Sequence, residues 1–236
     1  MARSLESLHG GNGQPKELPN HGVEIRFAEI EKDAAAIAKI FSEPGVIEHL
    51  AGVAPAMTKR NIREFRKKIQ QYMPDITLTN IPILIATADE LKSSYSNPNS
   101  RELLVAVRDG EIVGTITIEK GGEGMLWGQV SRTAVSESEK GQGRIRKGQG
   151  TGTRLLQAAN NRMFNELGYR GASAGIIRGV KDDHIPLHTF ENAGYRLAGS
   201  QSDICLGWSV AEDMFVYRNS VRVTREIPRE VLPKVA

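Results

Sequence analysis

Hydrophobic and polar residues alternate along several stretches of the chain, and a period of two residues predicts β-strands. Five stretches show this alternation or a short unbroken apolar run, namely residues 23–30, 103–107, 112–118, 125–135 and 172–177. Asp109-Gly110 separates the second stretch from the third, and Asp-Gly between two such stretches is a strong signal for a hairpin turn. The pattern therefore predicts a sheet that contains a β-hairpin.

Apolar residues recur every three to four positions in other stretches, and this spacing predicts amphipathic helices. Four helices are expected, over residues 32–41, 58–72, 151–167 and 183–193. Thr58 can cap the second helix, and Pro74 ends it. Residues 81–86 are apolar and fit either an extra strand or a buried segment, whereas residues 93–100 are rich in Ser and Asn and predict a loop.

Composition divides the chain into a central domain and two terminal segments. Residues 1–21 are rich in Gly, Ser, Asn and Pro, so we expect a flexible N-terminal tail. Residues 22–220 have a length that suits a single domain. Residues 221–236 contain two prolines and are expected to form a C-terminal extension, either a trailing arm or a strand exchanged with a partner.

A glycine-rich loop precedes the third predicted helix. The residues from Arg146 to Leu156 read RKGQGTGTRLL, with glycines at alternate positions. Glycine clears side chains from the backbone, and the first turn of a helix carries N–H groups without intrahelical partners. The positive end of the helix dipole and the cations Arg146 and Lys147 act in the same direction. Such a loop favours a phosphate or diphosphate ligand.

Two other phosphate-binding loops do not fit this segment. A P-loop requires Gly-Lys-Ser/Thr after its four-residue spacer, but Gly148 is followed by Gln149 and Gly150. The dinucleotide-binding fingerprint requires a third glycine at the position of Thr153. From the residues alone, a glycine-rich turn that binds no ligand remains the alternative.

The segment resembles the acyl-CoA loop of the GCN5-related N-acetyltransferase (GNAT) superfamily, whose pattern is Gln or Arg, two residues, Gly, one residue, and Gly or Ala. Residues 147–152 fit this pattern, with Lys147 in place of the usual Gln or Arg. The predicted order of elements, closed by Gly194-Tyr195-Arg196, is similar to the family core. The resemblance implies an α/β (α+β) fold, with a mixed, mostly antiparallel central sheet of six to seven strands flanked by helices.

The resemblance also implies a function. Family members transfer an acetyl group from acetyl-CoA to an amine, by direct attack within a ternary complex. The positions that correspond to cofactor contacts are Thr133, Val135, Arg146, Lys147, Gly148, Gln149, Gly150, Thr151, Gly152, Thr153, Asp183 and Phe190. No metal is implied. The alternatives are a catalytically weak or silent CoA-binding or regulatory module, and a protein that binds another polyphosphate.

Acyl transfer requires a donor for the oxyanion and a route for the proton of the amine. By family position, the oxyanion donor is a backbone N–H near the end of the strand 125–135, and it is assigned to Val135. Glu119 and His188 are the candidate base or acid, with Glu123 and His184 as further candidates.

One catalytic residue of the family is missing. Phe190 stands where the family has a tyrosine that protonates the leaving thiolate, and phenylalanine cannot donate a proton. The thiolate could leave unaided, since a thiol has a pKa near ~8.5. Otherwise Tyr195, His188 or Tyr217 acts as the acid, or the protein binds CoA without efficient catalysis.

The connection before the glycine loop is longer than the family requires. Residues 136–145 form this insert, which is expected to be either a flexible surface excursion or a lid. As a lid it would bring Arg144 and Arg146 to the 3′-phosphate of CoA, because a guanidinium donates hydrogen bonds in pairs.

Composition narrows the partners and the location. The 236 residues are 39% hydrophobic and 25% charged with a net charge of +3, which is ordinary for a globular protein and argues against a nucleic-acid partner. The single cysteine, Cys205, excludes an intramolecular disulfide and a cysteine-based zinc cluster. No apolar run approaches the roughly 18 residues of a membrane span and no secretory signal is recognisable, so we expect a cytoplasmic protein.

The acceptor is the least constrained part of the prediction. A small amine or an amino-acid amine is expected, with a protein N-terminus or a lysine side chain as the runner-up. The resemblance implies a pocket walled by the early helices and the C-terminal hairpin, and Trp127 and Trp208 could contribute to it. A homodimer is also plausible by resemblance.

Overall fold

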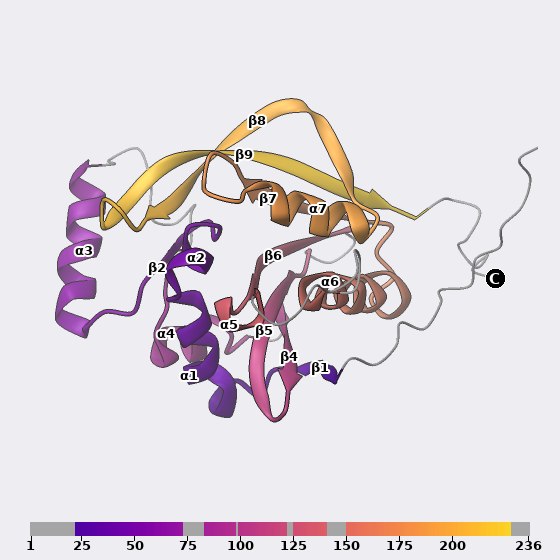
Figure 1. Cartoon of the computed structure of the whole chain (residues 1–236), viewed down its shortest axis with the longest axis horizontal. Helices are drawn as coiled ribbons and strands as arrows, with labels where there is room; N and C mark the ends of the chain where they lie inside the picture. Colours follow the sequence, from indigo (N-terminus) through magenta and orange to yellow (C-terminus); the bar gives the residue numbers. More distant parts are fainter. Residues whose placement is uncertain (1–21, 73–82, 98, 122–124, 141–149, 228–236) are drawn as a thin grey trace, which may run out of the picture.

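A seven-stranded sheet with the order β1-β4-β5-β6-β7-β9-β8 runs through the centre of the molecule (Figure 1). A computed structural model describes residues 22–72, 83–97, 99–121, 125–140 and 150–227. Neighbouring strands of the sheet are antiparallel, except that β6 and β7 are parallel. The strands are β1 (Val23–Phe27), β4 (Arg101–Arg108), β5 (Glu111–Glu119), β6 (Trp127–Val135), β7 (Gly171–Ile177), β8 (Arg196–Ser209) and β9 (Met214–Glu226).

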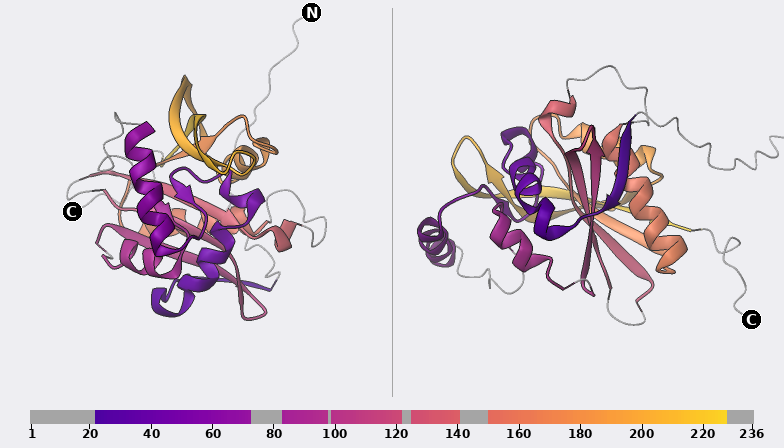
Figure 2. Two further views of the ribbon diagram at one scale, coloured as in Figure 1. Left: turned by 90° about the vertical axis from the view of Figure 1, so that its left-hand side faces the viewer. Right: turned by 90° about the horizontal axis from the view of Figure 1, so that it is seen from below.

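Helices cover both faces of this sheet (Figure 2). One face carries α1 (Ile30–Phe41), α2 (Pro44–Ile47), α4 (Ala88–Ser94) and a small parallel pair of strands, β2 (Val53–Ala54) and β3 (Leu84–Ile85). The other face carries α6 (Thr151–Asn161), its π-helical continuation η1 (Arg162–Glu166) and α7 (His184–Asn192). Each face has its own cluster of buried apolar side chains, so the sheet separates two cores.

Two helices lie outside these layers. The helix α3 (Lys59–Tyr72) stands at one end of the molecule beside the tip of the β8–β9 hairpin (Figure 1), and the short α5 (Glu137–Lys140) follows β6. The predicted fold class is confirmed, since the sheet is mixed, mostly antiparallel and flanked by helices. The four predicted helices correspond to α1, α3, α6 with η1, and α7.

The first predicted strand is too long. The strand β1 ends at Phe27 and α1 begins at Ile30, whereas the alternating pattern extended to residue 30. The reason is the carboxylate of Asp33, which accepts a hydrogen bond from the N–H of Glu29 at 2.8 Å and thereby caps the helix. The guanidinium of Arg26, 2.6 Å away, holds the pKa of Asp33 below its usual value and ties β1 to the same helix.

The stretch before β4 contains a helix that the pattern did not predict. The helix α4 includes residues 93 and 94, which were expected to be loop, and the hydroxyl of Thr87 caps it by accepting the N–H of Glu90 at 3.3 Å. Of residues 81–86, Leu84 and Ile85 form β3, and both are buried together with Ala86, so this stretch is both a short strand and a buried segment. Residues 81 and 82 lie outside the described residues.

The expected C-terminal boundary falls within the sheet. The strand β9 continues to Glu226 and pairs with both β7 and β8, so the extension predicted from residue 221 begins inside this strand. Val223 is fully buried, which explains why the chain stays in the sheet. The predicted tail 1–21 and residues 228–236 lie outside the described residues.

Small residues bring β6 and β7 together where these strands pair. The pairing of Gly128 with Ala172 is flanked by the pairs Trp127–Gly171 and Gln129–Ser173. A Cβ atom on Gly128 would lie 2.8 Å from the Sδ of Met163 and 2.8 Å from the ring of Tyr169, both of which are buried. The absence of a side chain at residue 128 therefore lets the strand lie against η1.

We expect Gly128→Ala to lower the free energy of unfolding by roughly 1–3 kcal/mol, because the new methyl group overpacks this contact. Gly175→Ala, in the neighbouring strand β7, is the control, since a Cβ there meets no atom within 4 Å. Urea denaturation of both variants measures the effect. Equal stability of the two variants would contradict the expectation.

Candidate functional site

The strands β6 and β7 separate beyond their short region of pairing. Their parallel pairing ends at Gln129 and Ser173. Farther along, the described pairing of β6 is to β5 alone and that of β7 is to β9 alone. The facing edges of residues 130–135 and 174–177 therefore lack ladder partners within the described part of the chain. Backbone N–H and C=O groups on such an edge can pair with an extended ligand.

A bulge interrupts the pairing of β6 with β5 in the same region, where β6 has separated from β7. Thr117 pairs with Ser131 and Thr115 pairs with Ala134, so two residues of β6 lie opposite one residue of β5. One of the two is Arg132, whose φ of 46° lies in the left-handed region that larger side chains rarely adopt. A bulge of this kind turns backbone groups out of the ladder and is often found beside active sites.

Three buried polar atoms around the bulge have no hydrogen-bond partner among the described residues. They are the Nε of Arg132, the Oγ1 of Thr133 and the Oγ1 of Thr115. An unsatisfied buried polar group costs about 1–3 kcal/mol, and native proteins keep few of them. Their concentration at one bulge marks this position as polar and incompletely satisfied, as functional sites often are.

The first turn of α6 lies next to the end of β6. Gly150 is the N-cap residue and has an extended backbone, and no side chain of the described residues caps the helix. A Cβ atom on Gly152 would lie 3.2 Å from the Cγ2 of Thr189 in α7 and 3.6 Å from the Cγ2 of Val135 in β6. The structure therefore brings together the predicted residues Val135, Gly150 and Gly152, with uncapped helix N–H groups beside them.

Only part of the predicted glycine loop belongs to the described residues. Arg146, Lys147, Gly148 and Gln149 lie outside the described residues, as do positions 141–145 of the predicted insert. The described part of the insert, residues 136–140, is anchored to the body of the protein and differs from a flexible excursion.

Asp183 has a local structural role in the turn between β7 and α7. Its Oδ2 accepts the N–H of Gly179 at 2.7 Å and the Nε of Arg178 at 3.1 Å. The backbone N–H of Gly179, followed by the charge of Arg178, holds the pKa of Asp183 below its usual value. The carboxylate thus fixes the turn that leads into α7, and its predicted contact with a cofactor stays a prediction.

Phe190 and Tyr195 belong to the core beneath α6. Phe190 is buried and lies edge-on to the ring of Tyr195, with 5.1 Å between the ring centroids. Tyr195 is 2% exposed, and its hydroxyl donates to the Oδ1 of Asn160 at 2.8 Å. Burial raises the pKa of Tyr195 above its usual value. Tyr195 therefore has neither the exposure nor the free hydroxyl that an acid in the site needs, whereas Tyr217 is exposed on β9.

Glu119 lies beside the bulge, with both carboxylate oxygens engaged. One oxygen accepts the Nε of Arg101 at 2.6 Å. The other accepts the hydroxyl of Ser131 at 2.9 Å and lies 3.5 Å from the Nη1 of Arg132. This network joins β4, β5 and β6, so the predicted base is also a structural residue.

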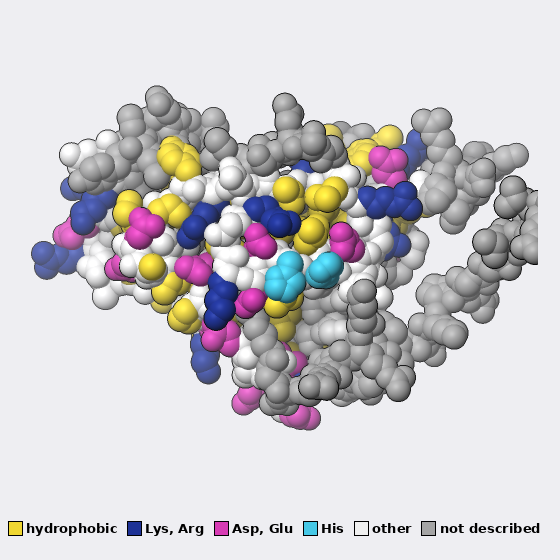
Figure 3. Space-filling model, turned by 45° about the horizontal axis from the view of Figure 1, so that its top comes forward, with side chains coloured by type: hydrophobic (Ala, Val, Ile, Leu, Met, Phe, Trp, Pro, Cys, Tyr) yellow, Lys and Arg dark blue, Asp and Glu magenta, His cyan; other side chains and the backbone are white. Residues whose placement is uncertain are grey.

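His188 lies on the outer side of α7. Its side chain is 60% exposed, and its Nδ1 is 3.0 Å from the Oε2 of Glu191. The ring of His184 lies 6.0 Å away on the same surface, where Figure 3 shows two histidines side by side. The next residue of α7, Thr189, lies beside Gly152 in the first turn of α6. Glu123 lies outside the described residues.

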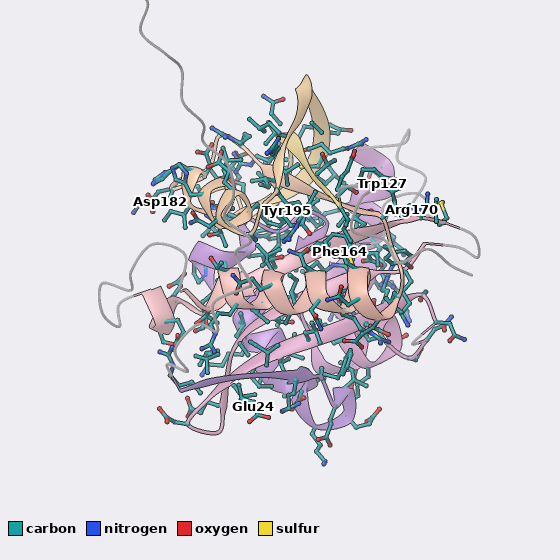
Figure 4. All side chains as sticks on the ribbon, turned by 90° about the vertical axis from the view of Figure 1, so that its right-hand side faces the viewer. Glu24, Trp127, Phe164, Arg170, Asp182 and Tyr195 are labelled. Atoms are coloured by element: carbon teal, nitrogen blue, oxygen red, sulfur yellow. The ribbon has the colours of Figure 1, made fainter. Side chains whose placement is uncertain are left out.

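A hollow of about 700 Å³ lies between α3 and the tip of the β8–β9 hairpin. The rings of Phe65, Trp208 and Phe215 form its floor, with centroids 5.3 to 5.8 Å apart. Its polar lining comes from Asn61, Glu64, Lys68 and Asp213. An early helix, the C-terminal hairpin and Trp208 thus line a hollow, and its use as the acceptor pocket stays a prediction. Trp127 lies elsewhere, near Arg170 (Figure 4).

The arrangement around the bulge depends on residues that the sequence alone did not identify. The sequence pattern assigned Arg132 to a strand, and none of the neighbouring residues indicates that its backbone is left-handed. Thr189 lies one position from the predicted His188, but a helical pattern cannot tell which side contacts α6.

Among the described residues, no three His, Cys, Asp or Glu side chains form a metal-binding group. No helix of the described chain is long and apolar enough to span a membrane.

No protein-family model and no curated protein matches the sequence. Solved structures do match. The spermidine N-acetyltransferase from Vibrio cholerae, in complex with CoA and spermine, is 11% identical with a TM-score of 0.58, over 87% of this chain and 95% of that chain.

Two further solved structures are similar. An acetyltransferase of the GNAT family from Streptococcus pneumoniae is 16% identical with a TM-score of 0.52, over 87% of this chain and 99% of that chain. The ribosomal-protein-alanine N-acetyltransferase from Brucella melitensis is 16% identical with a TM-score of 0.52, over 86% and 99%. At these identities the similarity shows the fold. It is the fold that the resemblance to the GNAT acetyltransferases predicted for this chain.

We expect Tyr195→Phe to lower the free energy of unfolding by about 1 kcal/mol, because Asn160 loses its donor in the core. The same variant should leave the acyl-transfer rate and its pH profile unchanged. Urea denaturation and a pH–rate profile measure the two effects. A large loss of rate at unchanged stability would instead identify Tyr195 as the acid.

Proposed function

We propose that this protein transfers an acetyl group from acetyl-CoA to an amine, by direct attack within a ternary complex. One observation carries the proposal: the separation of β6 from β7, the bulge in β6 and the uncapped start of α6 coincide at one place. An extended thioester with a diphosphate fits this combination. The fold of the structural neighbours, and the presence of CoA in one of them, support it.

The chain's own groups fit the parts of acetyl-CoA. The N–H groups at the first turn of α6 suit the diphosphate, and Gly150 and Gly152 keep side chains away from it. Arg146 and Lys147 would add positive charge. The unpaired edge of β6 offers N–H and C=O groups to the pantetheine arm in the manner of an added strand.

The chemistry follows from the same geometry. The attacking amine must be neutral, although a free alkylamine has a pKa near ~10.4. Glu119 is the described carboxylate closest to the bulge in the hydrogen-bond network, and it would accept the proton through water. A backbone N–H near Val135 would stabilise the oxyanion as the nitrogen–carbon bond forms. The carbon–sulfur bond then breaks, and the thiolate leaves without a tyrosine.

The acceptor would enter from the hollow between α3 and the β8–β9 hairpin. Its lining combines aromatic and methionine side chains with Glu64, Lys68 and Asp213, so it suits an amine with an apolar body. A small amine or an amino-acid amine is therefore our first choice, and a protein N-terminus or lysine is the second. The spermine bound to one neighbour, and the ribosomal-protein alanine in the name of another, support these two choices.

A second candidate function is a CoA-binding module with little or no catalysis. The observation that favours it is the pair Phe190 and Tyr195, since one lacks a hydroxyl and the other has its hydroxyl in the core. Release of free CoA with a panel of amines separates the two functions. We further propose a cytoplasmic location, and the homodimer expected by resemblance stays a prediction.

We expect Gly150→Val to weaken acetyl-CoA binding at least about tenfold, because a branched side chain would occupy the diphosphate site. The variant should fold normally, since a Cβ at this residue meets no atom of the described residues within 4 Å and its φ of −70° suits any L-residue. Calorimetry measures the affinity and a thermal melt measures stability. Unchanged affinity in a folded variant would reject the proposed diphosphate site.

We expect Met214→Lys to raise the KM for the amine about tenfold, because it adds a cation to the lining of the acceptor hollow. The affinity for acetyl-CoA should not change. Asn219→Lys, on an exposed residue of the same strand that does not line the hollow, is the matched control. Equal effects of the two substitutions on KM would place the acceptor elsewhere.

A further inference from the structure

The short helix α5 connects the end of β6 with the start of α6, and its residue Glu139 lies at the centre of this connection. The side chain of Glu139 is 4% exposed. Its carboxylate lies 2.9 Å and 3.0 Å, through its two oxygens, from the Nη1 of Arg108 in β4, and it accepts the hydroxyl of Thr151 at 3.2 Å. A buried carboxylate requires such partners, and here they come from two different elements.

The contact with Thr151 joins residues on either side of the glycine loop. Glu139 precedes the loop in sequence, and Thr151 is the first residue of α6 and is itself buried. Within the same segment, the N–H of Ser136 donates to the C=O of Val113 at 2.9 Å and so continues the pairing of β6 with β5. The hydrogen bond from Thr151 to Glu139 therefore fixes the first turn of α6 relative to the end of β6.

The opposite side of α5 is held by a second set of contacts. The carboxylate of Glu43 accepts the hydroxyl of Ser136 at 2.7 Å and the N–H of Glu137 at 2.6 Å. The carboxylate of Glu137 in turn accepts the N–H of Gly45 in α2. These contacts fix α5 on the body of the protein, so Glu139 is a rigid support for α6.

We propose that Glu139 is a positioning residue for the diphosphate of CoA, an inference that rests on the proposed function. It acts through Thr151 by holding the N–H groups of the first turn of α6 at a fixed place beside the end of β6. Arg108 neutralises its charge, which lets a carboxylate lie close to an anion site without repelling the ligand. Correct placement of such donors matters because hydrogen bonds weaken steeply when they are misaligned.

The test compares CoA binding with turnover of two thioesters. Glu139→Gln should weaken CoA binding about tenfold in calorimetry, which needs no acceptor. With an amine acceptor, kcat/KM should fall about tenfold for acetyl-CoA and stay unchanged for S-acetylpantetheine, which lacks the diphosphate. A purely structural role would lower kcat/KM for both thioesters in the same proportion, and that result would overturn the proposal.

Two controls keep the test decisive. Glu111→Gln removes the same charge from an exposed position at the start of β5, outside the contacts of α5, and should leave the ratio of the two thioesters unchanged. Thr151→Ser keeps the hydroxyl and should bind CoA like the wild type, whereas Thr151→Val should not. The double variant of Glu139→Gln and Thr151→Val should bind CoA no more weakly than the weaker of the two single variants. The reason is that both substitutions act on the same hydrogen bond, from Thr151 to Glu139.

Other outcomes are equally clear. Unchanged or tighter CoA binding in Glu139→Gln overturns the positioning role and leaves the proposed function in place. Should Glu139→Gln fail to fold, the comparison of Thr151→Ser with Thr151→Val decides, and equal affinities of these two would also overturn it. Failure of the wild-type protein to bind CoA would reject the proposed function before any variant is measured.

Discussion

The short pairing between β6 and β7 is the constraint on which the rest of the structure depends. Two parallel neighbours require a crossover connection, and α6 with η1 provides it. Gly128 lets β6 lie close to this helix, and three residue pairs hold the two strands together. Beyond these three pairs, in the described part of the chain, β6 pairs only with β5 and β7 pairs only with β9. An edge of unpaired backbone groups therefore remains inside an otherwise complete sheet.

The bulge and its surroundings show how that opening is kept rigid. Arg132 adopts a left-handed backbone that larger residues rarely tolerate, and the neighbouring side chains hold it there. Its guanidinium lies 3.3 Å from the hydroxyl of Tyr95, which is also hydrogen-bonded to Thr117, and 3.5 Å from Glu119. Polar contacts on one face of the sheet thus support the backbone groups that the opening presents. The carboxylate of Glu139 in α5 gives the same support to the start of α6.

Catalysis in this arrangement would depend on placement more than on a dedicated acid. Phe190 and Tyr195 complete the core beneath α6, and the buried hydroxyl serves Asn160. Since a thiol is already a moderate acid, with a pKa near ~8.5, its thiolate can leave without a protonated tyrosine. The larger contributions would come from the oxyanion donor and from holding amine and thioester together.

Local patterns in the sequence determined five strands of the main sheet, the four main helices and the glycine-rich start of α6, because periodicity and glycine spacing are properties of neighbouring residues. The patterns did not give the bounds of β8 and β9. The capping signal from Thr87 to Glu90 was also present and would have predicted α4. Only the tertiary structure decided that β6 bulges at Arg132, that Phe190 and Tyr195 are core, and that Glu139 supports Thr151. These features arise from contacts between segments far apart in the chain, and no local pattern specifies which side chains meet there.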